Sequence, residues 1–172
     1  MTMTNDADLG TLITAPDGHP QLRFERRLRH PVERVWRALT DPVELEAWFP
    51  AAIATEWRPG AAIRFTFPEG EGEGVGEDAL RGTVVAVDPP RLLEFRWDRD
   101  RLRFELSSDG DGCRLVFVNT LHDETYAPHQ VGAGWHLCFE WLEAVLGGAA
   151  PERDATGRVA ELEGRYRSAF GT

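Results

Sequence analysis

The stretch VGAGWHLCFEWLEAVL, residues 131–146, carries the longest helical pattern in the chain. Its apolar residues recur every three or four positions, as they do on one face of an α-helix. That face consists of Val131, Trp135, Cys138, Phe139, Leu142, Val145 and Leu146. Glu140 and Glu143 lie on the opposite face, and Gly147-Gly148 ends the pattern as glycines commonly end helices. The sequence therefore predicts one long amphipathic helix, which needs a second apolar surface to cover.

The segment before this helix supplies that surface, because its apolar residues alternate with polar ones as in β-strands. Alternation begins at Ala61 and predicts further strands at Thr83–Val87, Leu92–Trp97, Leu102–Leu106 and Cys113–Thr120. The connectors are mostly short and rich in Asp, Pro and Gly, which favours antiparallel hairpins. One connector, Pro68–Ala79, is long; we interpret its glycines and acids as a solvated loop, in preference to a cation-binding loop.

The N-terminal third predicts a strand or hairpin followed by two short helices. Thr11–Thr14 and Leu22–Arg29 are β-prone and flank the turn signal Asp17-Gly18. His30–Leu39 has helical spacing, with Pro31 suited to the first helical position. Asp41 is a good N-cap for a second helix that ends near Trp48. This order of elements predicts an α+β fold, in which a curved antiparallel sheet wraps around a long C-terminal helix and leaves an apolar cavity beneath it.

The end of the chain adds another amphipathic segment. Pro151–Phe170 places Val159, Leu162, Tyr166 and Phe170 at helical spacing. We divide the chain into an N-terminal extension (1–10), one domain (11–148) and a C-terminal amphipathic extension (149–172). The strand at Cys113–Thr120 is apolar on both faces, so its outer face needs cover. The C-terminal helix or the second copy in a homodimer could provide that cover.

Composition limits the partners and the location of the protein. The net charge of −10 argues against nucleic acid, which needs a concentrated basic face. No apolar run approaches the roughly 18–20 residues of a membrane span. Met1–Leu9 has no basic segment followed by an apolar one, so we expect no secretory signal and a cytoplasmic location. Cys113 and Cys138 lie in apolar segments and are expected to be buried.

An ordered set of short segments resembles the branch of the SRPBCC (START-like, helix-grip) superfamily that contains the activator of the 90-kDa heat-shock protein ATPase. The segments lie between about residues 20 and 148, and each marks a different joint of the fold. They are His30–Leu39, Thr40-Asp41-Pro42, Trp48-Phe49, Pro59-Gly60, Asp88–Trp97, Gly112–Leu115 and Gly134-Trp135. The resemblance implies a helix-grip fold with a cavity that accommodates a ligand. Relatives in the superfamily include lipid and hormone binders, polyketide cyclases and aromatases, and a co-chaperone domain.

The candidate ligand-binding residues are those expected to face the cavity. They are Trp48, Phe49, Phe65, Phe95, Trp97, Phe104, Phe117, Asn119, His122, Trp135 and Phe139. The aromatic residues could form the core or the wall of a pocket, since a pocket wall is a core surface with one side missing. Asn119 and His122, at the end of the last strand, could supply the few polar groups that orient a ligand in an apolar pocket.

We find no recognisable catalytic constellation and predict no cofactor. The chain has no Gly-x-Ser-x-Gly, Cys-x-x-Cys or His-Glu-x-x-His motif, so its catalytic residues stay unknown. His129 and His136 share a helical face with Glu140 and Glu143, which could in principle bind a metal ion. We expect this face to be exposed to solvent and to lack the outer hydrogen bonds that hold metal ligands, and therefore predict no metal.

Three functions agree with this reading. The first is binding of a small hydrophobic molecule in the cavity. The second is an enzyme of the cyclase, aromatase or hydrolase type, with Asn119, His122 and Arg96 as polar participants. The third is a co-chaperone-like or other protein-interaction module. One fold hosts unrelated activities, so the fold alone does not choose among them.

Overall fold

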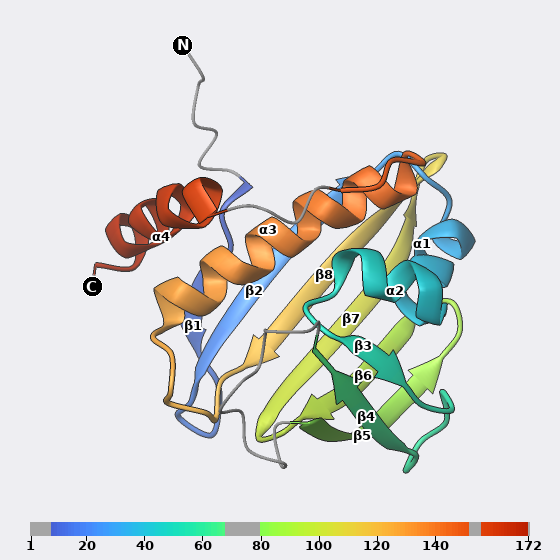
Figure 1. The fold of residues 1–172 in the computed structure, drawn as a ribbon, viewed down its shortest axis with the longest axis horizontal. Helices are drawn as coiled ribbons and strands as arrows, with labels where there is room; N and C mark the ends of the chain where they lie inside the picture. The colour runs from blue at the N-terminus through green and yellow to red at the C-terminus, as the bar shows by residue number, and fades with distance from the viewer. Residues whose placement is uncertain (1–7, 68–79, 152–155, 172) are drawn as a thin grey trace.

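The computed structural model describes residues 8–67, 80–151 and 156–171. Figure 1 shows a curved antiparallel sheet with a long helix lying across its concave face. The strands are β1 (Thr11–Thr14), β2 (Pro20–Leu28), β3 (Ala52–Ala54), β4 (Ala62–Thr66), β5 (Arg81–Asp88), β6 (Leu92–Trp97), β7 (Asp100–Asp109) and β8 (Gly112–Thr120). The helices are α1 (Val32–Thr40), α2 (Pro42–Trp48), α3 (Pro128–Leu146) and α4 (Thr156–Phe170).

In the sheet, strands from early and late in the chain lie side by side. The order is β1-β2-β8-β7-β6-β5-β4-β3, so the second strand pairs with the last one. The predicted α+β helix-grip fold is confirmed. The short strand β3, which follows Trp48, was not predicted, because three residues are too few for alternation to be recognised.

Helices α1 and α2 form as their capping residues indicate. The Asp41 carboxylate accepts hydrogen bonds from the backbone N–H groups of Val43 and Glu44, which confirms it as the N-cap of α2. Pro31, expected as the first helical residue, is the N-cap of α1 instead, so the helix begins one position later, at Val32. The indole N–H of Trp48 donates to the carbonyl of Ala38 at 2.8 Å and fixes α2 against α1.

The long helix α3 closes the concave face of the sheet with the predicted apolar residues. Trp135, Cys138, Phe139 and Leu142 are all buried. Inward-facing residues alternate with outward-facing ones on β6, β7 and β8, as period-two strands require. Cys113 and Cys138 are both free thiols, and both are buried, as expected.

Helix α4 packs against α3, and this placement corrects two expectations (Figure 1). Leu162 and Tyr166 of α4 are fully buried. They cover the face of α3 that was expected to be exposed to solvent; His136 on that face is only 4% exposed, so the expectation was wrong. Because α4 lies on α3, it does not cover the outer face of β8, where Val116 and Val118 stay partly exposed.

The loop predicted at Pro68–Ala79 lies outside the described residues. Within the described ranges, no helix is both long enough and apolar enough to cross a membrane.

Candidate functional site

Most of the predicted ligand-binding aromatic residues pack against one another beneath α3. The ring centroids of Phe104 and Phe117 are 4.7 Å apart, and those of Phe117 and Trp135 are 4.8 Å apart. Of these predicted aromatic residues, the ones that are at most 1% exposed are Trp48, Phe49, Phe65, Phe95, Phe104, Phe117 and Phe139. Their rings pack into one cluster between the helix and the sheet, which we call the aromatic floor.

A pocket of about 670 Å³ opens beside this floor, between α3 and the turn that joins β6 to β7. Trp97, Asn119 and Trp135 are the predicted site residues that line it. Its apolar wall consists of Pro50, Phe67, Trp97, Leu102, Tyr126, Val131, Gly134, Trp135, Leu137, Cys138 and Trp141. Its polar wall consists of Asp98, Asp100, Asn119, Asp123, Gln130 and Glu163.

Asn119 positions the tryptophan at the inner wall of this pocket. Its Oδ1 accepts a hydrogen bond of 2.9 Å from the indole N–H of Trp135. Its Nδ2 lies 3.3 Å from the carbonyl oxygen of Thr120 and 3.4 Å from Oδ2 of Asp100. Since Asn119 is only 1% exposed, these contacts fix both the amide and the orientation of the Trp135 ring.

Asp100, the first residue of β7, lies next to Asn119 and binds the backbone that follows β8. Its Oδ1 accepts the backbone N–H groups of His122 at 2.9 Å and Asp123 at 3.1 Å, so it caps the segment that leaves β8. Burial raises the pKa of the Asp100 carboxyl, and the hydrogen bonds from these two N–H groups oppose that shift. The carboxylate is thus used to fix the chain, and it also faces the pocket.

The polar groups of this pocket are mainly hydrogen-bond acceptors. Four acidic residues line it, Asp98, Asp100, Asp123 and Glu163. Among the described residues that line it, there is no arginine and no histidine. The aromatic rings add electron-rich faces, which attract cations. The pocket therefore presents an apolar and aromatic surface with negative charge at its edge.

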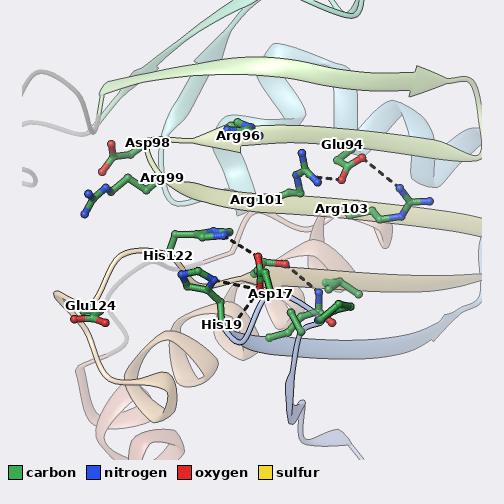
Figure 2. Close-up of a pocket in the computed structure, with 15 residues that line it drawn as sticks. Asp17, His19, Glu94, Arg96, Asp98, Arg99, Arg101, Arg103, His122 and Glu124 are labelled. Carbon is green, nitrogen blue, oxygen red and sulfur yellow. Dashed lines mark hydrogen bonds and ion pairs between the residues drawn. The ribbon is translucent and has the colours of Figure 1, made fainter.

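His122 lies on the other face of the sheet, away from this pocket. It was expected at the mouth of the cavity beneath the helix. Figure 2 shows it instead beside Asp17 and His19 in a second, open pocket of about 960 Å³. Arg96, the other outward-facing participant of the enzyme hypothesis, lines the same second pocket.

The second pocket has a mixed charge. Arg96, Arg99, Arg101 and Arg103 line it together with Glu94. The Glu94 carboxylate lies 3.5 Å from Arg101 and 3.3 Å from Arg103, and holds these two guanidinium groups against the sheet. The pKa of Asp17 lies below its usual range, mainly because the backbone N–H of His19 donates a hydrogen bond to its carboxylate. The side chains of His19 and His122 lower this pKa further.

Sequence reasoning missed Asp17 and His19 as partners of His122. The turn signal Asp17-Gly18 and the end of the strand at Thr120 were both recognised. The missing information was the pairing of β2 with β8, which joins residues that lie about one hundred positions apart in the chain. No local pattern of residues specifies such a register by itself.

Solved structures with the same fold cover nearly the whole chain. A conserved protein of unknown function from Enterococcus faecalis, EF2215, has a TM-score of 0.74 at 23% identity, over 94% of this chain and 90% of that one. CalU16 from Micromonospora echinospora has a TM-score of 0.70 at 21% identity, over 95% and 96%. A protein encoded by gene BPP1335 from Bordetella parapertussis has a TM-score of 0.66 at 26% identity, over 96% and 94%.

Among proteins with curated functions, none matches this chain significantly in sequence. A family model does match it, over residues 29–147, from the start of α1 to the end of α3. That range contains the aromatic floor and most of the residues that line the pocket beside α3. The chain belongs to the family described as activator of Hsp90 ATPase homolog 1-like protein.

Proposed function

We propose that this protein binds a small aromatic or aliphatic molecule in the pocket beside α3, and that the molecule carries a hydrogen-bond donor or a positive charge. The observation that carries the proposal is the composition of this pocket. It has a volume of about 670 Å³, within the usual range of roughly 300–1,000 Å³ for small-molecule sites.

The apolar part of the pocket supports a ligand with a ring or a chain. Trp97 and Trp135 line the pocket beside the buried aromatic floor, and Asn119 holds the Trp135 ring in place. A ligand that enters such a preformed surface loses little free energy to rearrangement of the protein. The dominant favourable contribution is then burial of apolar surface, about 25 cal/mol for each Å² removed from water.

The polar part of the pocket supports the ligand's charge. Asp98, Asp123 and Glu163 offer carboxylate oxygens, which accept hydrogen bonds and attract positive charge. A fatty acid or another carboxylate would bring a negative charge towards these groups and would find no arginine among the described lining residues. An amine or a hydroxyl group would be bound more favourably.

We do not extend the proposal to an enzyme of the cyclase, aromatase or hydrolase type. That hypothesis named Asn119, His122 and Arg96 as participants around one cavity. His122 and Arg96 line the pocket on the outer face of the sheet, whereas Asn119 lines the pocket beside α3. These three side chains therefore do not meet around a single substrate.

The test is a thermal-shift titration with three probes that share one ring system: naphthylmethylamine, naphthylmethanol and naphthoate. Ligand that binds only the folded state raises the melting temperature as its concentration exceeds the dissociation constant. We expect the amine to give the largest increase, the alcohol a smaller one and the carboxylate the smallest. The proposal fails if none of the probes raises the melting temperature, and its charge argument fails if naphthoate gives the largest increase.

A further inference from the structure

The pairing of β2 with β8 brings two histidines together on the outer face of the sheet. In this antiparallel register Gln21 lies opposite Thr120, and the N–H of Leu121 donates to the carbonyl of Pro20 at 2.9 Å. One step further along, His19 lies beside His122. Their ring centroids are 4.2 Å apart, although their positions in the chain are far apart (Figure 2).

Both side chains share the parity of the outer face, on which Gln21 and Thr120 lie. The side chains of Gln21 and Thr120 are hydrogen-bonded to each other at 3.0 Å. His19 and His122 continue this pair of rows towards the β1–β2 turn. The fold therefore places the two imidazole rings next to each other.

Asp17 completes the cluster from within the turn. The backbone N–H of His19 donates to its Oδ1 at 3.0 Å, which turns the carboxylate back towards the sheet. His19 Nδ1 lies 3.1 Å from Oδ1, and His122 Nε2 lies 3.4 Å from Oδ2. One ligand atom from each of the three residues lies within 4.8 Å of the other two.

We infer that Asp17, His19 and His122 form a binding site for a divalent transition-metal ion such as zinc. Two neutral imidazoles and one carboxylate are ligands that zinc uses in catalytic sites, where three protein ligands leave one position open. Donor atoms around a tetrahedral zinc ion lie roughly 3.3 Å apart, given metal–ligand distances of about 2.0–2.1 Å. The contacts of His19 and His122 with Asp17, one to each carboxylate oxygen, are 3.1 and 3.4 Å long and so are close to this separation.

The ring of His19 also favours a missing ligand. Its Nδ1, the atom that faces Oδ1 of Asp17, is shielded from solvent and has no hydrogen-bond partner within the part of the chain that the structure describes. The backbone N–H of His122, in contrast, is held by Asp100 at 2.9 Å. The position of the second histidine is thus fixed, while the first has a ligand atom that is not committed to a competing hydrogen bond.

The open coordination position belongs to the second pocket, which also holds Arg96, Arg99, Arg101 and Arg103. Glu94, Asp98 and Glu124 in the same pocket balance most of this positive charge. The arginines still favour a metal ion whose fourth ligand is an anion or hydroxide. The side chains of His19 and Asp17 are 45% and 52% exposed, so ion and fourth ligand can both reach the site from solvent.

The test uses the full chain without an affinity tag, titrated with Zn²⁺ by calorimetry and with Co²⁺ by visible absorption. We expect saturable binding of one ion and the absorption bands of cobalt bound by nitrogen and oxygen. His122→Ala, His19→Ala and Asp17→Asn should each lower the affinity at least about tenfold, because each removes a ligand. His30→Ala removes a histidine outside the cluster and should bind like the original chain.

Each variant is checked by its melting temperature without metal, which should stay close to that of the original chain. His19→Ala keeps the test decisive if His122→Ala does not fold, because His19 lies in an exposed turn. The inference is overturned by absence of saturable binding, or by unchanged affinity in a folded His122→Ala or His19→Ala. It is also overturned by an intense near-ultraviolet cobalt–thiolate band, which would assign the ion to Cys113 or Cys138.

Discussion

Nδ1 of His136 and the hydroxyl oxygen of Tyr166 lie 2.8 Å apart in the buried contact between α3 and α4. The backbone N–H of Gly10 donates to the same hydroxyl oxygen, also at 2.8 Å. Nε2 of His136 lies 3.6 Å from a carboxylate oxygen of Glu140, which favours the proton of the neutral imidazole on Nε2. Nδ1 then accepts the hydrogen bond that the Tyr166 hydroxyl donates. These hydrogen bonds join Gly10, just before β1, and Tyr166 of α4 to α3.

Removal of the Tyr166 hydroxyl should destabilise the protein. Tyr166→Phe leaves the buried Nδ1 of His136 and the N–H of Gly10 without their partner, which costs about 1–3 kcal/mol. The free energy of unfolding, measured by urea denaturation, should fall by that amount. Tyr126→Phe is the matched control, because Tyr126 is 62% exposed, and its change should stay within about 0.5 kcal/mol. Equal effects of the two substitutions would contradict the role given to the buried hydroxyl.

Acidification should weaken the fold through His136. Burial lowers the pKa of His136 to about 4, from an ordinary value of 6.5, and the nearby Arg26 acts in the same direction. Between these two values the unfolded chain binds a proton that the folded chain does not, so stability falls as the pH decreases. The contribution is fully present above about pH 6.5, and on the order of 3 kcal/mol is lost by pH 4.

The measurement is the free energy of unfolding from pH 7 to pH 4, compared between the original chain and His136→Gln. Glutamine can still accept a hydrogen bond from Tyr166 but does not titrate, so the variant should lose less stability over this range. Other groups titrate in both proteins, and the difference between the two slopes isolates His136. Parallel curves would show that His136 does not carry the pH dependence.

Much of the fold could be predicted from local patterns, because alternation and helical spacing reflect burial directly. The docking of α4 could not. His136 and Glu140 look like residues of a solvated helix face, and nothing local indicates that Tyr166 of α4 covers the first and Arg158 pairs with the second. Leu162 and Tyr166 did indicate an apolar face on the last helix, but a sequence pattern does not name the surface that such a face contacts.

The candidate site was predictable only in part, for a similar reason. An aromatic residue on an inward face has the same pattern whether it fills the core, as Phe95 does, or lines a pocket, as Trp97 does. Tertiary packing makes that difference. The pairing of His19 with His122 likewise depends on a register between strands at opposite ends of the domain.

The addition of a methyl group should stabilise the protein at one glycine of α3 and not at another. A Cβ at Gly132 would lie 3.2 Å from Cδ1 of Tyr166, whereas a Cβ at Gly134 would meet no atom within 4 Å. Replacement of a helical glycine by alanine ordinarily stabilises by up to about 1 kcal/mol. Gly134→Ala should therefore raise the free energy of unfolding, and Gly132→Ala should not raise it, because the added methyl group is compressed against α4. Equal gains at both positions would contradict the close packing of α3 against Tyr166.

The same open position at Gly134 offers a direct test of the pocket beside α3. Gly134 lines this pocket, and a Cβ at this position meets no atom within 4 Å, so a larger side chain can extend from it into the pocket. Gly134→Phe should keep or raise the melting temperature of the protein without ligand, since phenylalanine forms helix more readily than glycine. Its ring would occupy volume that a ligand needs, so the increase in melting temperature caused by naphthylmethylamine should fall by at least about half.

Gly164→Phe is the matched control for this blocking variant. Gly164 is also a helical glycine with no atom within 4 Å of a Cβ, but it lies on α4 outside the pocket lining. Its response to naphthylmethylamine should equal that of the original chain. If the Gly134→Phe variant is stable and binds the amine as well as the control does, the ligand occupies another place, and the pocket beside α3 is not the binding site. If only Gly134→Phe loses the response, the apolar and acidic walls around Trp97 and Trp135 are the surface that recognises the ligand.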